Sequence, residues 1–276
     1  MGPLAIILIS VAASLLLLFL LFLFLIKPRK RRAAVEEFKE CRFAHRGLHG
    51  EGAAENSLTA FRLAVEAGYG IELDVRLSSD GELVVFHDDT LTRVTGICGR
   101  VDEKTKDELS KIKLSGTEDT VPTFAEVLSL VGGRVPLLVE LKEDAGKYGV
   151  TEKTVKMLSE YEGKYLIESF NPLALARVKK LMPNALRGIL SETFFKEKKY
   201  RKPLYFLLQN LLLNVVSRPD FVAFRHTDSG CAAFRAVRAF FKPVTFAWTV
   251  GSQKEEDEAK KHGFDGVIFE GYIPEK

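Results

Sequence analysis

The stretch IELDVRLSSDGELVVFHDD, residues 71–89, carries three titratable side chains inside what the pattern predicts to be two strands. They are Glu72, Asp74 and His87. An unpaired charge taken out of water costs several kcal/mol or more, so ordinary buried strands exclude such residues. We therefore expect these three side chains to be present for a chemical function.

A third carboxylate, Glu140, lies near the end of the aliphatic run LLVEL. Clustered carboxylates repel one another by roughly 4 kcal/mol per close pair at an effective dielectric of about 20, unless a cation lies between them. Glu72, Asp74 and Glu140 therefore predict an oxygen-ligand site for one hard divalent cation, Mg²⁺ or Ca²⁺. The alternative is that each carboxylate pairs with a neighbouring Arg or Lys.

Two histidines, His45 and His87, lie at the ends of predicted strands. They could be metal ligands, although a zinc site would usually need a third His or Cys. They could instead be the acid and the base of a proton-transfer pair, since an unperturbed pKa of about 6.5 suits that task. Arg46 and Lys142 add positive charge nearby, which indicates an anionic substrate such as a phosphate. Together these groups favour cleavage of a phosphodiester.

The elements that must position these groups alternate short aliphatic runs with helical patterns, which is typical of a parallel sheet with crossover helices. Eight parallel strands in about 235 residues predict a (β/α)₈ TIM barrel, whose active site lies at the C-terminal ends of the strands. Phe170 and Trp248 lie at two such ends and are expected to line the substrate site. The predicted strands are RFAH (42–45), IELDV (71–75), LLVEL (137–141), YLIES (165–169), LRGIL (186–190), DFVAF (220–224), VTFAWTV (244–250) and GVIF (266–269).

The run LVVFH, residues 83–87, would be a ninth strand. Too few residues separate it from IELDV for a parallel crossover, so we expect it to return antiparallel as a hairpin. With Asp80 and Gly81 as the two central turn residues, Asp74 would lie opposite His87, whereas a longer turn would slip this register. The following segment, 90–121, lacks a clear period, and we expect an insertion over the barrel mouth.

Residues 4–26 carry no charge and would extend roughly 34 Å as a helix, enough to cross a bilayer. A basic cluster follows, and by the positive-inside rule it keeps the rest of the chain in the cytosol. A cleaved signal peptide is the competing interpretation, but signal peptides place their positive charge before a shorter apolar run. The cluster consists of Lys27, Arg29, Lys30, Arg31 and Arg32.

These features divide the 276 residues into a single transmembrane anchor (1–26), a basic juxtamembrane linker (27–40) and a cytoplasmic catalytic domain (41–276). With 46% hydrophobic and 28% charged residues the composition is that of a globular protein. The net charge of +3 implies no nucleic-acid surface. Cys41, Cys98 and Cys231 lack metal-ligand spacing and are expected to be free thiols, and nothing indicates an oligomeric state.

An ordered series of motifs along the chain resembles glycerophosphodiester phosphodiesterases over about residues 43–273. The motifs are AHRG, ENSLTAFRLAVEAGYGIELDV, DGELVVFHDDTLTRVTG, VELK, ESFNP and WTV. The resemblance implies a metal-dependent TIM-barrel hydrolase that acts on glycerophosphodiesters and releases glycerol 3-phosphate and an alcohol. We expect a glycerophosphodiester or a lysophospholipid as the substrate. Matched residue by residue, it implies the metal ligands Glu72, Asp74 and Glu140, the catalytic His45 and His87, and the phosphate contacts Arg46 and Lys142.

Two positions depart from the family pattern. Gly251 follows WTV where the family usually has Asn, and the last strand reads DGVIFEG where the family favours a Thr-Asp ending. Both lie at the expected barrel mouth, where the alcohol part of the substrate would bind. A lysophospholipase D or a relative of phosphatidylinositol phospholipase C is an alternative enzyme, and a tethered lipid-binding barrel is the non-enzymatic alternative.

A second apolar stretch, LYFLLQNLLLNVV (204–216), follows a basic run. One helix over this stretch would carry an apolar stripe suited to cover the barrel strands. The stripe would contain Leu204, Leu207, Leu208, Leu211, Leu212 and Val215. Contact with a membrane interface is the alternative role for this stretch.

Overall fold

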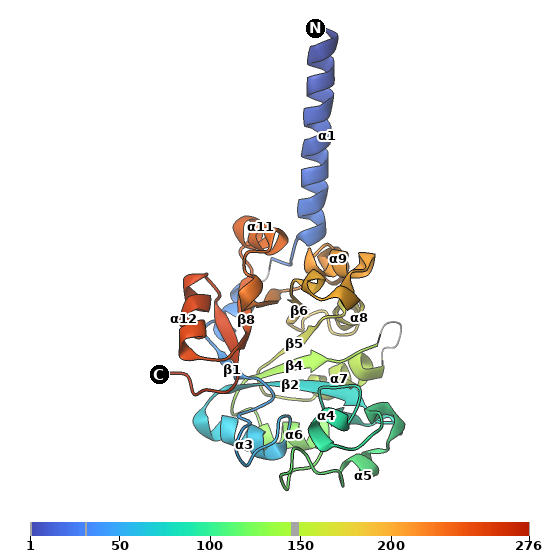
Figure 1. The fold of residues 1–276 in the computed structure, drawn as a ribbon, viewed down its shortest axis with the longest axis vertical. Coiled ribbons are helices and arrows are strands. Elements are labelled where there is room, and N and C mark those ends of the chain that lie inside the picture. Colours follow the sequence, from blue (N-terminus) through green and yellow to red (C-terminus); the bar gives the residue numbers. More distant parts are fainter. Residues whose placement is uncertain (1, 31, 145–148, 276) are drawn as a thin grey trace.

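The computed structural model describes residues 2–30, 32–144 and 149–275 (Figure 1). In this part of the chain eight parallel strands close into a barrel, because β1 pairs with both β9 and β2. The predicted strands and the TIM barrel are therefore confirmed. The strands are β1 (Arg42–Ala44), β2 (Gly70–Leu77), β4 (Leu137–Leu141), β5 (Tyr165–Ser169), β6 (Arg187–Ser191), β7 (Phe221–Arg225), β8 (Val244–Val250) and β9 (Gly266–Phe269).

Amphipathic helices cover the outside of the barrel, and their ends follow local sequence signals. The Ser57 hydroxyl accepts a hydrogen bond from the Ala60 amide at the start of α3, and Thr123 forms a capping box with Glu126 at the start of α6. The main covering helices are α3 (Leu58–Ala67), α6 (Phe124–Val131), α7 (Gly149–Ser159), α8 (Pro172–Leu181), α11 (Ala232–Phe241) and α12 (Gln253–Lys261), and a short η5 (His226–Asp228) follows β7.

The barrel interior is filled by large apolar side chains from alternate strand positions. Gly188 on β6 makes room for one of them, because a Cβ there would lie 2.0 Å from the Phe221 ring. Val35 and Phe38, from α2 (Arg32–Val35) and η1 (Glu36–Phe38), are buried in the same cluster. Part of the segment expected as a linker thus closes the barrel at the end where its strands begin. Arg31, in the same segment, lies outside the described residues.

The strand β3 (Leu83–Val85) pairs antiparallel with β2, as predicted, but the predicted register is wrong by one residue. The Phe86 amide donates to the Asp74 carbonyl at 3.0 Å, so Phe86 rather than His87 lies opposite Asp74. The Ser78 amide donates to the Glu82 carbonyl, which leaves three residues in the loop instead of two. The third of them, Gly81, has φ +80°, the left-handed conformation that such a loop requires.

The segment 90–121 contains α4 (Thr92–Thr95), η2 (Val101–Glu103) and α5 (Lys106–Leu109). Its apolar side chains form a small separate core with Val84 and Phe86, which flank the end of β3. This segment therefore holds the hairpin that ends in His87. The core contains Ala54, Leu91, Val94, Val101, Leu109, Ile112, Leu114 and Val121 in addition.

The single helix predicted over 204–216 is wrong. After η3 (Phe194–Lys196) and η4 (Lys198–Tyr200), the chain forms α9 (Pro203–Gln209) and then α10 (Asn214–Ser217). Between them Leu211 has φ +56° and is buried, so the helix axis is broken and the apolar stripe is not continuous. Leu204 and Leu207, which the stripe would have buried, are exposed.

The N-terminal helix α1 (Pro3–Ile26) projects away from the barrel (Figure 1). Its most apolar 18-residue window has a mean hydropathy of 3.1 and is 0% buried. By length and composition α1 is long enough to cross a membrane, a test that a signal sequence also passes.

Candidate active site

The register of the parallel strands places three carboxylates side by side in one layer of the barrel interior. Asp74 on β2 pairs with Glu140 on β4, which pairs with Glu168 on β5. Glu72, two residues before Asp74, faces the same interior, and all four side chains are buried. One oxygen of each of Glu72, Asp74 and Glu140 lies within 4.8 Å of the others.

Two cations contact this carboxylate cluster. The Lys142 ammonium lies 3.0 Å from Asp74 Oδ1 and 2.8 Å from Glu140 Oε1. The Arg46 guanidinium lies 3.5 Å from Asp74 Oδ2 and donates to Glu55 at 2.8 Å. Arg46 has φ +56°, which turns the chain after β1 so that its backbone amide donates to Glu72 at 3.0 Å.

The cations neutralise only part of the cluster. Burial raises the pKa of Asp74, but Lys142, with smaller contributions from His87 and Arg46, outweighs burial and holds the pKa well below its usual range. Burial and the neighbouring carboxylates raise the pKa of Glu72 and Glu168 well above theirs. Burial also raises the pKa of Glu140 to about 7, although Lys142 opposes the shift.

The side chains of the carboxylate cluster are suited to bind a divalent cation. Four described carboxylates face two described cations in a buried space, so the two cations cannot balance all four carboxylates in their ionised form. Glu72, Asp74 and Glu140 offer three convergent oxygens, the ligands that Mg²⁺ and Ca²⁺ prefer. The predicted alternative, in which Glu72, Asp74 and Glu140 are each satisfied by Arg or Lys, accounts for Asp74 and for the contact of Glu140 with Lys142, but it leaves Glu72 with a strongly raised pKa.

His45 follows β1 and is held by a carboxylate at the end of β9. Its Nδ1 lies 2.6 Å from Glu270 Oε2, whereas its Nε2 points to the cluster, 4.0 Å from Glu72 Oε2. Burial lowers the pKa of His45, and Glu270 opposes that shift. The hydrogen bond from His45, assisted by the His49 ring 3.7 Å from Glu270 Oε2, in turn lowers the pKa of Glu270.

His87 is held in the same way at the end of the hairpin. Its Nδ1 lies 2.6 Å from Asp88 Oδ1, and Asp88 accepts a hydrogen bond from Arg93. The guanidinium of Arg76 donates twice to the His87 carbonyl, at 2.9 and 2.7 Å. Burial lowers the pKa of His87 to about 4, assisted by Lys142 and Arg46 and opposed by Asp74.

A small cavity of about 100 Å³ lies between the two histidines and the carboxylates. Phe170 and Trp248 form part of its wall, with ring centroids 5.5 Å apart in an edge-to-face contact. Among the described residues Trp248 Nε1 has no hydrogen-bond partner although it is buried.

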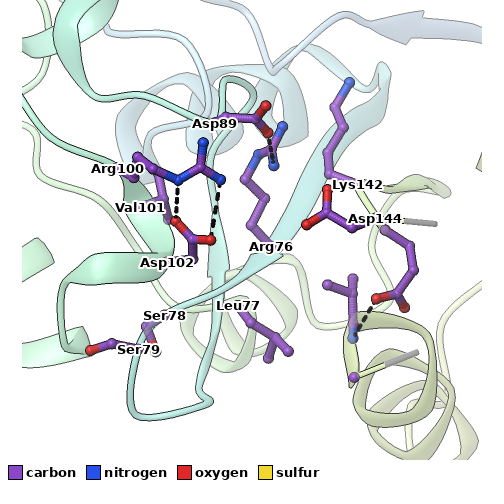
Figure 2. Close-up of a pocket in the computed structure, with 13 residues that line it drawn as sticks. Arg76, Leu77, Ser78, Ser79, Asp89, Arg100, Val101, Asp102, Lys142 and Asp144 are labelled. Atoms are coloured by element: carbon purple, nitrogen blue, oxygen red, sulfur yellow. Dashed lines mark hydrogen bonds and ion pairs between the residues drawn. The ribbon is translucent and has the colours of Figure 1, made fainter. Parts of the chain in front are cut away.

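A larger cavity of about 420 Å³ lies beside the β2–β3 hairpin (Figure 2). Figure 2 shows Arg76 paired with Asp89, and Arg100 paired with Asp102, along its walls. Neither His45 nor His87 lines this cavity. These two ion pairs hold the hairpin and the 90–121 segment. Lys142 is the one predicted site residue that lines this cavity. Because both histidines lie at the smaller cavity, that cavity is the candidate site.

The structure brings together all nine residues predicted for the site. Seven line the small cavity. Lys142 contacts the cavity-lining Glu140, and Asp74 contacts Lys142 and the cavity-lining Arg46. Glu168, Glu270 and Asp88 were not predicted. Glu168 is the first residue of the ESFNP motif, Asp88 follows His87 directly, and Glu270 stands in the unusual DGVIFEG ending, so each had a weak signal in the sequence.

Comparison with known proteins gives one consistent family. A model of the glycerophosphoryl diester phosphodiesterase family matches residues 45–271. A glycerophosphodiester phosphodiesterase of Caldanaerobacter subterraneus subsp. tengcongensis is 34% identical over 241 residues, which cover 82% of this chain and 91% of that protein. Glycerophosphodiester phosphodiesterase 1 of Homo sapiens is 28% identical over 211 residues, covering 68% of this chain and 60% of that protein.

Solved structures agree on the fold. A glycerophosphodiester phosphodiesterase of Thermotoga maritima superposes with a TM-score of 0.64 at 25% identity, covering 83% of this chain and 94% of that one. A phosphodiesterase of Oleispira antarctica, solved with the product sn-glycerol-3-phosphate, has a TM-score of 0.70 at 24% identity, with 85% and 94% covered.

Proposed function

The chain belongs to the glycerophosphoryl diester phosphodiesterase family of phosphoric diester hydrolases, and from this premise we propose which of its residues carry out the hydrolysis. The substrate phosphate enters the small cavity between His45 and His87. A P–O bond is cleaved, which yields glycerol 3-phosphate and an alcohol. The observation that carries this proposal is that each histidine is fixed through Nδ1 by a carboxylate at 2.6 Å beside the same buried carboxylate cluster.

The two histidines exchange protons with the substrate through Nε2. One takes the proton of the attacking oxygen, and the other gives a proton to the leaving alkoxide. The attacking oxygen belongs to water or to the 2-hydroxyl of the glycerol group. Attack by the 2-hydroxyl forms a cyclic phosphate first. Glu270 and Asp88 keep Nδ1 occupied as a donor, so that Nε2 of each ring faces the cavity.

The positive groups hold the substrate phosphate. Arg46 and Lys142 border the cluster and neutralise part of the charge that develops on the phosphoryl oxygens. Glu72, Asp74 and Glu140 are the residues that would hold a divalent cation, Mg²⁺ or Ca²⁺, which when bound supplies a Lewis acid for a phosphoryl oxygen. The Trp248 N–H is a donor for an oxygen of the glycerol or the alcohol.

An assay of the full chain tests the reaction and its cofactor together. Glycerophosphocholine and glycerophosphoethanolamine are incubated with the protein, with and without EDTA, and products are identified by phosphorus NMR. We expect glycerol 3-phosphate, loss of activity on chelation, and recovery with Mg²⁺ or Ca²⁺. Release of phosphocholine would instead indicate the phospholipase C type of cleavage, and activity that survives chelation would contradict the metal site.

Lysophospholipids are a second substrate class that one observation favours. A row of aromatic rings runs from the cavity wall to the outer helix α9. The ring centroids of Phe170 and Phe194 are 6.0 Å apart, and those of Phe194 and Tyr205 are 5.3 Å apart. Such a row suits an acyl chain, since aromatic side chains bury large apolar areas. We expect the variant Phe170→Leu to raise KM for a lysophospholipid more than for glycerophosphoethanolamine. Equal changes for both substrates would argue against an acyl-chain site.

We propose that α1 anchors the protein in a membrane with the barrel on the cytoplasmic side. The support is its apolar length and the basic residues that follow it. Alkaline carbonate extraction of membranes tests this proposal, with the expectation that the protein stays in the pellet and keeps its N-terminus. A barrel released into the soluble fraction with a new N-terminus after residue 26 would identify α1 as a signal sequence instead.

A further inference from the structure

The side of the barrel that faces α1 exposes apolar side chains that the fold does not cover. On α9, Leu204 is 54% and Phe206 48% exposed, and on α11 Phe240 is 56% exposed. Both helices lie at the end of the molecule from which α1 projects (Figure 1). We name Leu204, Phe206, Leu207 and Phe240 the α9–α11 face.

The lower part of α1 is fixed to this side of the barrel. Asn214 on α10 donates to the Ile26 carbonyl at 3.0 Å, and Arg218 donates to the carbonyls of Phe24 and Lys27. The Arg29 amide donates to the Pro219 carbonyl at 2.8 Å, immediately after α1 ends. These contacts set the height of the barrel relative to the helix, so the position of α1 in a bilayer also determines where the α9–α11 face lies.

The contact between Phe19 and Phe240 shows at which level along α1 the α9–α11 face lies. Their ring centroids are 5.7 Å apart, and Phe19 lies seven residues before the end of α1, about 10 Å along the helix axis. The part of α1 before Phe19 is only about 25 Å long, whereas the hydrocarbon core of a bilayer is about 30 Å thick. A bilayer that α1 spans must therefore extend beyond Phe19, to the level of Phe240.

The charge of the neighbouring loop suits the same surface. Residues 192–202, which lead from β6 into α9, contain five basic and two acidic side chains. Lys198, Lys199 and Lys202 are exposed on this loop. Basic side chains around an apolar patch attract anionic lipid headgroups.

We propose that the α9–α11 face rests on the bilayer that α1 spans, with the basic loop 192–202 among anionic headgroups, so that the barrel lies against the membrane rather than moving freely on a tether. The inference rests on the proposed anchorage of α1. It goes beyond that anchorage because it assigns a second lipid contact to the barrel itself.

Tryptophan quenching by brominated lipid tests this contact in the full chain. The protein has one tryptophan, Trp248, which lies in the cavity wall, so the unsubstituted chain is the background. We compare Phe206→Trp and Phe240→Trp with Leu63→Trp, whose site on α3 is 41% exposed and lies toward the opposite end of the molecule (Figure 1). A fourth variant, Leu16→Trp, reports on α1. All are reconstituted in brominated phosphatidylcholine containing phosphatidylglycerol.

We expect strong loss of fluorescence at positions 16, 206 and 240, and no loss beyond background at position 63. Quenching at 16 without quenching at 206 and 240 would overturn the docking of the barrel while leaving the anchor intact; a second copy covering the face would give this result. No quenching at 16 would overturn the anchor and the inference with it. Activity on soluble glycerophosphocholine, measured for each variant, reports separately on the fold and on the proposed function.

A charge variant tests the lipid preference. In the Phe206→Trp background, Lys198→Glu should reduce the extra quenching that phosphatidylglycerol produces, and added salt should do the same because it screens these charges. Lys111→Glu, an equally exposed change beyond α5, is the matched control and should have no effect. Equal responses of the two lysine variants would contradict a local contact with anionic headgroups.

Discussion

At the scale of single residues, the two histidines share one arrangement. Nδ1 of His45 is bound by Glu270 and Nδ1 of His87 by Asp88, each at 2.6 Å. Asp88 in turn accepts from Arg93, and the His49 ring lies 3.7 Å from Glu270. This arrangement fixes the orientation of both rings. Proton transfer to and from the substrate should therefore depend on both rings independently.

We expect His45→Ala and His87→Ala each to lower kcat by about 10² to 10⁴-fold, the usual contribution of a general acid or base. Steady-state assays with glycerophosphocholine measure this effect. His262→Ala, an exposed histidine at the end of α12, is the control and should retain full activity. A variant of His45 or His87 with near-normal kcat would remove that histidine from the mechanism.

Glu270 acts through His45, and its removal should show in the pH profile. Glu270 raises the pKa of His45 against the lowering by burial, so Glu270→Gln should move the ionisation of His45 to lower pH. We also expect kcat to fall roughly 10 to 100-fold with little change in KM, as for other partners that orient a reacting group. Glu270→Asp should restore part of the activity. An unchanged pH profile would leave Glu270 with a structural role only.

At the scale of elements, the β2–β3 hairpin positions His87 beyond the end of the strand ladder. Arg76 holds the His87 carbonyl, and the core of the 90–121 segment packs against Val84 and Phe86 on the same hairpin. The loop conformation depends on Gly81, whose φ of +80° is unfavourable for other residues.

Gly81→Ala should destabilise the protein by about 1 kcal/mol, because alanine is strained at this φ. Urea unfolding of the full chain in detergent measures the change. Gly230→Ala is the matched control, since no atom lies within 4 Å of its added Cβ and its φ is not in the left-handed region. Equal stability of both variants would show that the loop tolerates another conformation.

At the scale of the whole molecule, the barrel concentrates buried carboxyl groups from β2, β4 and β5. Without a cation, the raised pKa values of Glu72 and Glu140 mean that these groups hold protons at higher pH than usual. A divalent cation has to displace those protons, so its affinity should fall as the pH falls.

We therefore expect the Kd for Mg²⁺ or Ca²⁺ to weaken up to about tenfold per pH unit for each proton displaced, between about pH 8 and about pH 6. Calorimetric titration in two buffers of different ionisation enthalpy measures both the affinity and the protons released. Saturating cation should also raise the unfolding temperature. Glu140→Gln should lose most of the binding, whereas Glu66→Gln, on the exposed side of α3, should not. A pH-independent Kd would contradict displacement of protons.

Much of the fold was predictable from the sequence, because the barrel strands are short runs of buried residues separated by helices with clear caps. The carboxylates and histidines were predictable for the same reason, since Glu72, Asp74 and Glu140 interrupt otherwise apolar strands. The break in the helix predicted over 204–216 was not predictable, because it depends on burial of the Leu211 side chain against the barrel.

The sequence by itself determined the barrel, the identity of the ionisable groups and their place at the strand ends, because these follow from local patterns and from closure of a parallel sheet. Only the tertiary structure decided which carboxylate holds which histidine. Glu270 lies 225 positions from His45, and no local pattern encodes a contact across that separation. The hairpin register was likewise decided by a three-residue loop, which moved Phe86 rather than His87 opposite Asp74.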